Sequence, residues 1–309
     1  MTDLSKQKKR LKASIQIPLG ERIFYLADDA LMIFLCVLIL VPLIHVVAGS
    51  FSDGMSYMTH SGLLLWPLSP TLDAYRSVIH NQNIWTGYGN TLFIVIVGTV
   101  LDMLCSLVAA YVLSRKNYML KKFFNLMVVF SMYFSGGMIP FFLVVKGVGL
   151  YKSIWSLIIP SLINVFNLVI VRTAMTGVPD SLEESAQLDG AGHFTILFRI
   201  ITPLILPSVA VVALYYAVAH WNSWFNAMLF IKDRKYYPLQ LIINEMLNAT
   251  KMDTSQISQA DQQLLEGMQA QLDGVKYALI VVAVVPMLAI YPFVQKFFEK
   301  GVTMGSIKG

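Results

Sequence analysis

The sequence predicts an all-α protein that crosses a membrane with six helices. Apolar residues make up 56% of the 309 residues and charged residues only 13%, and the mean hydropathy is +0.64. A soluble domain carries about 25% charged residues, so these few charges could not cover the surface of one. Spans in lipid must be helical, because lipid cannot satisfy open backbone groups. The composition excludes a disordered or fibrous chain and argues against a water-soluble globule.

Six apolar runs account for the predicted helices. Each has about 18 residues or more, enough to cross about 30 Å of hydrocarbon at about 1.5 Å per residue. The first run lacks the cleavage pattern of a signal peptide and is expected to remain as a span. Cys36 and Cys105 lie inside runs and are expected to be small buried hydrophobes rather than metal ligands. The runs are 30–48, 90–113, 123–145, 154–171, 203–231 and 277–295.

The Lys and Arg residues place both termini in the cytoplasm. They are most frequent in the N-terminal tail and in the loop after the second run, and inner loops of membrane proteins carry such an excess. The outer segment before the last run is locally basic, which is a mild conflict. We expect a cytoplasmic segment over 1–29, a membrane domain over 30–299 with outer loops 53–89 and 232–276 and an inner loop 172–202, and a cytoplasmic tail over 300–309.

The inner loop predicts two short helices joined at a glycine. Ser181 followed three residues later by Glu184 is a capping-box pattern, which predicts a helix start near Leu182. Gly190, with a second glycine two residues later, predicts the end of this helix. A second helix is expected to follow over 194–201. Taken alone, such a segment is equally typical of a connector on the membrane surface.

The same loop resembles the EAA loop of ABC importer permeases. That pattern is Glu-Ala-Ala, three residues, Gly, nine residues, then Ile-x-Leu-Pro, and this chain departs from it by Ser for one Ala and Thr for Leu. The segment 221–226 and the ending 291–309 are also similar to the carbohydrate, maltose-type branch for aldouronate, alginate-like or other complex oligosaccharides. The matching loop residues are Glu184, Ser185, Ala186, Gly190, Ile200, Thr202 and Pro203.

The resemblance implies the type I importer permease fold and a role as the permease subunit of an ATP-driven, binding-protein-dependent oligosaccharide importer in a bacterial cell membrane. It implies as partners a second permease, an ATPase dimer, an extracytoplasmic sugar-binding protein, the oligosaccharide and the lipid bilayer, and no nucleic acid. The chain has no G-x-x-x-x-G-K-[ST] phosphate loop. ATP and Mg²⁺ are therefore expected at the partner ATPase, and neither enzymatic activity nor a bound cofactor is expected of this chain.

The resemblance assigns coupling with the ATPase to the inner loop, acting as a rigid lever. Glu183 and Glu184 are expected to project from it, and a bulky or charged residue in place of Gly190 is expected to uncouple ATP hydrolysis from uptake. The C-terminal tail resembles tails that reach into the ATPase dimer, with a frayed terminus as the alternative. The coupling residues are Ser181, Glu183, Glu184, Ser185, Ala186, Asp189, Gly190, Ile200 and Pro203, and the tail residues are Gly305, Ser306 and Lys308.

Polar and aromatic side chains within the runs are candidates for the substrate path. Asp102 lies in the middle of a run, where an acid is costly, and is expected either to line the path or to make a structural hydrogen bond. Amides could bind sugar hydroxyls or bridge helices, and rings could stack on sugars or form a belt at the outer interface. The other candidates are Asn164, Asn167, Tyr216, Trp221, Asn222, Trp224 and Asn226.

Glycines and histidines inside or near the runs receive structural interpretations. Gly136 and Gly137 are expected to allow close helix packing, with a hinge as the alternative. The five histidines show no i, i+4 pair and no carboxylate cluster, so no metal site is expected. Three other functions stay open: an ion-gradient-driven secondary transporter, which usually carries several intramembrane charges, a permease for a solute other than sugar, and an intramembrane enzyme, which would need clustered His, Asp or Ser groups.

Overall fold

The computed structural model describes residues 18–58, 60–115, 120–249 and 274–290, together with Pro292 and Gln295. Within these residues the regular secondary structure is helical apart from one isolated bridge, so the all-α class is confirmed. The α-helices are α2 (Leu19–Ser50), α3 (Gly54–Met58), α4 (Asp73–His80), α5 (Gln82–Ser114), α6 (Lys121–Tyr133), α7 (Met138–Gly147), α8 (Val165–Thr176), α9 (Asp180–Leu188), α10 (His193–Thr195), α11 (Thr202–Leu204), α12 (Leu206–Trp221), α13 (Trp224–Phe230) and α14 (Leu239–Ala249), and an unlabelled helix covers Gly274–Ile290. The 3-10 segments are η1 (Ile154–Leu157), η2 (Ile159–Ser161) and η4 (Arg234–Tyr236), and η3 (Ile196–Ile201) is a π-helix.

The long apolar helices confirm a multi-pass membrane protein. Among the described residues, α2 and α5 are each long and apolar enough to cross a membrane, and counting each of three bent pairs as one span gives up to five. The bent pairs fall on the third, fourth and fifth apolar runs, and the sixth run corresponds to the apolar helix Gly274–Ile290. α2 begins at Leu19, so the helix extends over residues 19–29, ahead of the first apolar run.

The third run is not one straight helix. α6 and α7 meet at an angle of 118°. Gly137 between them has a φ of +88°, a left-handed conformation that glycine adopts at no steric cost. No atom lies within 4 Å of the position that a Cβ would occupy at Gly137. The two glycines therefore form a turn, and the expectation of close packing there is wrong.

The fourth and fifth runs are also broken. η1 and η2 precede α8, with a bend of 44°. The helical arm His193–Leu204 turns by 92° into α12, and α13 follows α12 as a separate short helix. Pro207 lies in the first turn of α12, where its missing N–H cannot continue the hydrogen bonding of the preceding arm. The expected span over 203–231 is therefore three segments in different directions.

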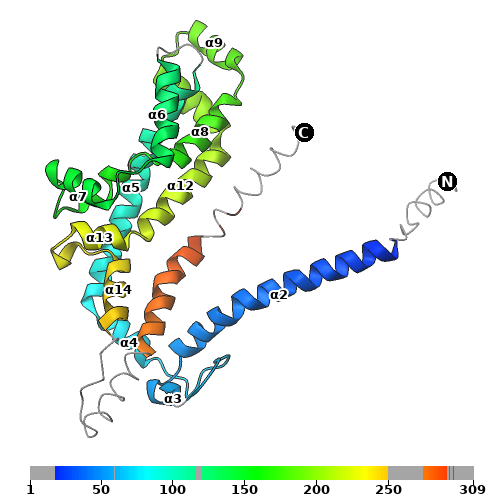
Figure 1. Ribbon diagram of the computed structural model, residues 1–309, viewed down its shortest axis with the longest axis vertical. Helices are drawn as coiled ribbons and strands as arrows, with labels where there is room; N and C mark the ends of the chain where they lie inside the picture. The colour runs from blue at the N-terminus through cyan, green and yellow to red at the C-terminus, as the bar shows by residue number, and fades with distance from the viewer. Residues whose placement is uncertain are drawn as a thin grey trace.

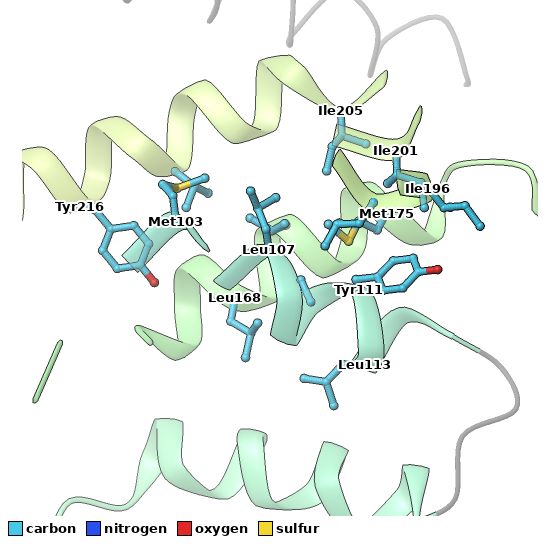
Figure 2. Packing of buried hydrophobic residues seen from close by; sticks show 14 of the residues in the cluster. Met103, Leu107, Tyr111, Leu113, Leu168, Met175, Ile196, Ile201, Ile205 and Tyr216 are labelled. Atoms are coloured by element: carbon cyan, nitrogen blue, oxygen red, sulfur yellow. The ribbon is translucent and has the colours of Figure 1, made fainter. Parts of the chain in front are cut away.

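α5, α8 and α12 form the core of the bundle. Figure 2 shows how Met103 and Leu107 of α5 converge with Leu168 of α8 and Ile201 of η3. Burial removes these apolar side chains from solvent, which stabilises the packing of the three helices by about 25 cal/mol for each Å² of apolar surface buried. The residues of this cluster with no exposed surface are Ala110, Val171, Met175, Ile196 and Val212.

α2 stands apart from this core. In Figure 1 it diverges from the bundle, and no residue in its most apolar window is buried. Cys36 on this helix is exposed and Cys105 on α5 is only half-buried, so the expectation that both cysteines are buried is wrong. An apolar helix with so much open surface requires lipid or another chain around it.

α3 and α4, which fall in the first segment expected outside the membrane, lie at the end of the molecule opposite α9 in Figure 1. Residues 82–89, expected in the first outer loop, belong to α5. In the second outer segment, the Asn90 side chain donates to the carbonyl oxygens of Lys235 and Tyr237 and ties this segment to α5. Residues 1–17 and 250–273 and the tail residues Gly305, Ser306 and Lys308 lie outside the described residues.

Candidate functional site

A polar cavity of about 530 Å³ lies beside α5, α8 and α12. Concave sites with convergent polar groups and rings are typical of small-molecule binding. No group of three or more His, Cys, Asp or Glu side chains in the described part of the chain is placed to hold a metal ion. The polar and aromatic residues that line the cavity are Asp102, Ser161, Asn164, Phe166, Asn167, Tyr215, Tyr216, His220, Ser223 and Asn226.

Asp102 is fully buried at the wall of this cavity and is held by His220. The His220 Nε2 atom lies 2.7 Å from the Asp102 Oδ2 atom, which joins α12 to α5. The Oδ1 atom is buried without a hydrogen-bond partner among the described residues. A Cβ on Gly98, one turn earlier, would lie 2.5 Å from the same Nε2 atom, so glycine is needed for this close approach. Asp102 thus makes a structural hydrogen bond and also lines the cavity.

Tyr216 ties three elements together at the cavity wall. Its hydroxyl lies 2.7 Å from the hydroxyl of Ser106 on α5 and accepts the backbone N–H of Asn164 at 3.0 Å. The Asn164 side chain caps α8 by accepting the backbone N–H of Asn167 at 3.2 Å. Asn164 and Tyr216 therefore fix the shape of the cavity as well as lining it.

Three expected residues of the substrate path lie outside the cavity. Trp221 is buried against Tyr88 of α5, with ring centres 6.3 Å apart. Trp224 packs edge-on against the next residue, Phe225, and the Asn222 side chain donates to a backbone carbonyl of α12. The break between α12 and α13 turns these side chains away, so the segment 221–226 contributes only Ser223 and Asn226.

The inner loop begins differently from the predicted capping box. α9 starts at Asp180, and the residue at its cap position is Pro179, whose side chain makes no capping hydrogen bond. Ser181 therefore lies inside the helix, whereas a capping residue must have non-helical backbone angles. The capping box is wrong because Pro179, with a φ of −59°, occupies the cap position and the helix starts at Asp180, two residues before the predicted start.

Gly190 ends α9 as predicted. Its φ is +83°, the Ala191 N–H donates to the Ala186 carbonyl at 2.9 Å, and the Gly190 N–H donates to the Gln187 carbonyl at 3.0 Å. This pair of bonds around a left-handed residue is the Schellman motif. The expected second helix is confirmed as the arm His193–Leu204, in which Ile200 packs against the core and Pro203 is exposed.

Glu183 does not project from α9 as expected. Its side chain is only 12% exposed and forms an ion pair with Arg115 at the end of α5. Tyr111, one turn earlier on α5, hydrogen-bonds both Glu183 and His193. No local sequence pattern indicates a role for Tyr111, Arg115 or His193, because their partners are far away along the chain. Ala186 faces the core, and the outer face of α9 is formed by Glu184, Ser185 and Leu188, followed by Asp189.

The sequence of this chain matches one known protein family. Residues 102–304 match the family of binding-protein-dependent transport system inner membrane components. The chain belongs to this family. The matched range includes the cavity and the inner loop, so membership confirms a role in binding-protein-dependent transport and contradicts the alternative of a secondary transporter.

This inner-membrane component is similar to known proteins both in sequence and in structure. It is 37% identical over 288 residues to the polygalacturonan/rhamnogalacturonan transport system permease protein YtcP of Bacillus subtilis (strain 168), which covers 93% of this chain and 99% of that protein. It is 38% identical over 275 residues to protein LplC of the same organism, covering 87% and 90% of the two chains. A chain in the crystal structure of a bacterial ABC transporter for the acidic polysaccharide alginate matches with a TM-score of 0.81 and 29% identity, over 91% of this chain and 98% of that one. This likeness confirms the permease fold.

Proposed function

We propose that this inner-membrane component imports oligosaccharides that contain uronate units, as one of two permeases in an ATP-driven importer. The observation that carries the proposal is the 37% identity, over nearly the full length of both chains, to a permease named for polygalacturonan and rhamnogalacturonan. The match to a transporter for alginate, another acidic polysaccharide, supports the same cargo class.

The remaining parts of the importer follow from this assignment. A second permease of the same family completes the membrane path, an ATPase dimer holds ATP and Mg²⁺, and a sugar-loaded binding protein delivers cargo at the outer face. Both termini lie in the cytoplasm. α9 lies at one end of the molecule in Figure 1, and Leu188 at its exposed face is 89% accessible. This apolar tip supports docking of loop 172–202 onto the ATPase.

The polar cavity is the part of this chain that contacts the sugar. Amide and hydroxyl groups of Asn167, Ser223 and Asn226 match the hydrogen-bonding capacity of sugar hydroxyls. Phe166 and Tyr215, with ring centres 6.2 Å apart, offer apolar surface for the C–H face of a sugar ring. Amides beside rings in one concave site support recognition of an uncharged sugar face.

The charge of the cavity indicates which part of the cargo it holds. The described residues that line it include neither Lys nor Arg, the partners that carboxylates require. Asp102 would repel a carboxylate placed beside it. We therefore assign the cavity to the hydroxyl-bearing face of the sugar, and we assign recognition of the uronate carboxylates to the second permease and the binding protein.

The test is the ATPase activity of the purified complex in nanodiscs. Activity is measured alone, with the empty binding protein, and with the binding protein loaded with galacturonate, alginate or neutral arabinose oligosaccharides. Stimulation by a uronate-loaded binding protein is expected. Stimulation by neutral oligosaccharides alone would contradict the cargo class. Absence of a co-purifying ATPase, with uptake that follows an ion gradient, would contradict the importer itself.

A further inference from the structure

Four side chains connect the inner loop to a single turn of α5. Tyr111 lies in the last turn of α5, and Arg115 is the residue directly after that helix. Arg115 forms the ion pair with Glu183 of α9. The Tyr111 hydroxyl lies 2.8 Å from Glu183 Oε1 and 3.0 Å from His193 Nδ1. The guanidinium carbon of Arg115 stands 4.7 Å from the centre of the Tyr111 ring.

The hydrogen-bond directions in this group are mutually consistent. An ionised carboxylate can only accept, so the Tyr111 O–H donates to Glu183 and the Tyr111 oxygen accepts the N–H of His193. Arg115 and Glu183 are 24% and 12% exposed, so water screens their attraction less than at an open surface. Charge-assisted bonds of this kind are about twice as strong as neutral ones. The group is therefore a firm attachment.

The attachment holds both helical arms of the loop, which are α9 and the arm His193–Leu204. Glu183 lies in α9, before the turn at Gly190, and His193 begins the arm after it. Both arms are thus fixed to the same turn of α5, although α5 is distant from them along the chain. By contrast, the direct chain connection from the second arm to α12 runs through a bend of 92°. Such a bend changes its angle more readily than a straight helix does.

α5 extends from this attachment to the opposite end of the molecule. It has 33 residues, a length of about 50 Å for an α-helix. Along the way it is joined to α12 through Asp102 and to the second outer segment through Asn90. Figure 1 shows α5 running through the bundle between the end with α9 and the end with α4. A displacement of the loop therefore has a direct rigid connection to the outer end.

We propose that Tyr111, Arg115, Glu183 and His193 are positioning residues that fasten loop 172–202 to α5, so that the loop and α5 move as one rigid body during transport. The proposal rests on the coupling role proposed above for this loop. It identifies α5, rather than the directly connected α12, as the helix that carries the movement outward. Glu183 acts within the chain, and the exposed Glu184 remains for contact with the ATPase.

Distances between spin labels in the whole complex test this proposal. Cys36 and Cys105 are replaced by Ser, and labels are attached to Leu188→Cys in the loop and Ile96→Cys on α5, which are 89% and 61% exposed. A second pair, Leu188→Cys with Met228→Cys on α13, where Met228 is 48% exposed, reports movement of the loop relative to α13. We expect the first distance to keep one narrow peak in the nucleotide-free and vanadate-trapped states, and the second distance to shift.

Variants of the ion pair distinguish attachment from general stability. Arg115→Ala is expected to broaden the first distance distribution, and the exchange Arg115→Glu with Glu183→Arg is expected to narrow it again, which a simple loss of folding would not allow. Arg199→Ala removes an exposed arginine of the loop that takes no part in the attachment, and it is expected to leave the peak unchanged. A shifted first peak in the unmodified trapped complex, or a narrow peak in Arg115→Ala, would overturn the proposal. If no ATPase co-purifies, the proposed function fails. The attachment can still be tested in that case, by comparing the first distance distribution of Arg115→Ala with that of the unmodified protein in the nucleotide-free state.

Discussion

His220 on α12 is bonded to Asp102 on α5 at 2.7 Å, across the middle of the helix bundle. The two residues are 118 positions apart along the chain, and their side chains are 4% and 0% exposed. Each would be costly alone in a membrane. Together they join the helix that is attached to the coupling loop with the helix that lines the cavity beside it.

Removing the imidazole should therefore destabilise the protein strongly. His220→Ala leaves the buried Asp102 carboxylate without its partner, and breaking a buried charged pair in this way costs about 3–5 kcal/mol. The double variant His220→Ala with Asp102→Asn should recover part of this loss, because the buried group is then neutral. Thermal unfolding of the detergent-solubilised complex measures both. Equal stability of His220→Ala and the unmodified protein would show that the pair contributes nothing.

The close contact between α5 and α12 gives a second prediction. Gly98→Ala places a methyl group 2.5 Å from His220 Nε2, and such overpacking costs about 1–3 kcal/mol. Gly89→Ala on the same helix is the matched control, since nothing lies within 4 Å of its Cβ position. Alanine is favoured over glycine in a helix by about 1 kcal/mol, so Gly89→Ala should not lower the unfolding temperature. A similar response of the two variants would contradict the packing described here.

The turn after α9 gives a third prediction, for coupling. Gly190→Ala has room for its methyl group, but it must adopt a φ of +83°, which costs a non-glycine residue about 1 kcal/mol or more. We expect more ATP hydrolysed per sugar imported in reconstituted vesicles, and a smaller defect for Gly190→Asn, because asparagine tolerates this conformation. Gly192→Ala, at a φ of −76°, is the control. An equal defect in the alanine and asparagine variants would argue against a backbone cause.

The cavity gives a fourth prediction, for transport. Asn226→Ala removes an exposed amide that lines the cavity. Loss of one hydrogen bond of about 0.5–1.5 kcal/mol should raise the half-saturating concentration of loaded binding protein by roughly 2- to 12-fold, without changing thermal stability. Asn222→Ala removes an exposed amide of the same segment that lies outside the cavity. Uptake that depends on Asn222 and not on Asn226 would place the sugar elsewhere.

Local patterns predicted the parts of the structure that depend on local forces. The apolar runs identified the spans, because lipid imposes helix on any segment of sufficient length. Gly190 identified the end of α9, because the left-handed conformation is cheap only for glycine. The same approach failed for Ser181, where a neighbouring proline started the helix earlier. The expectation for Gly136 and Gly137 also failed. The sequence stays apolar on both sides of the 118° bend between α6 and α7, so the apolar run gives no sign of the bend.

The sequence alone determined that this protein is a multi-pass helical protein with an EAA-like inner loop, since composition, helix length and motif spacing are properties of neighbouring residues. Only the tertiary structure decided that Asp102 meets His220, that Glu183 turns inward to Arg115, and that Trp221 and Trp224 face away from the cavity. These contacts join residues on different helices, and their geometry depends on where α12 bends and how closely Gly98 lets it approach α5. A proline or glycine permits a bend locally, but the distance at which two helices approach depends on the packing of the whole bundle, which no local pattern records.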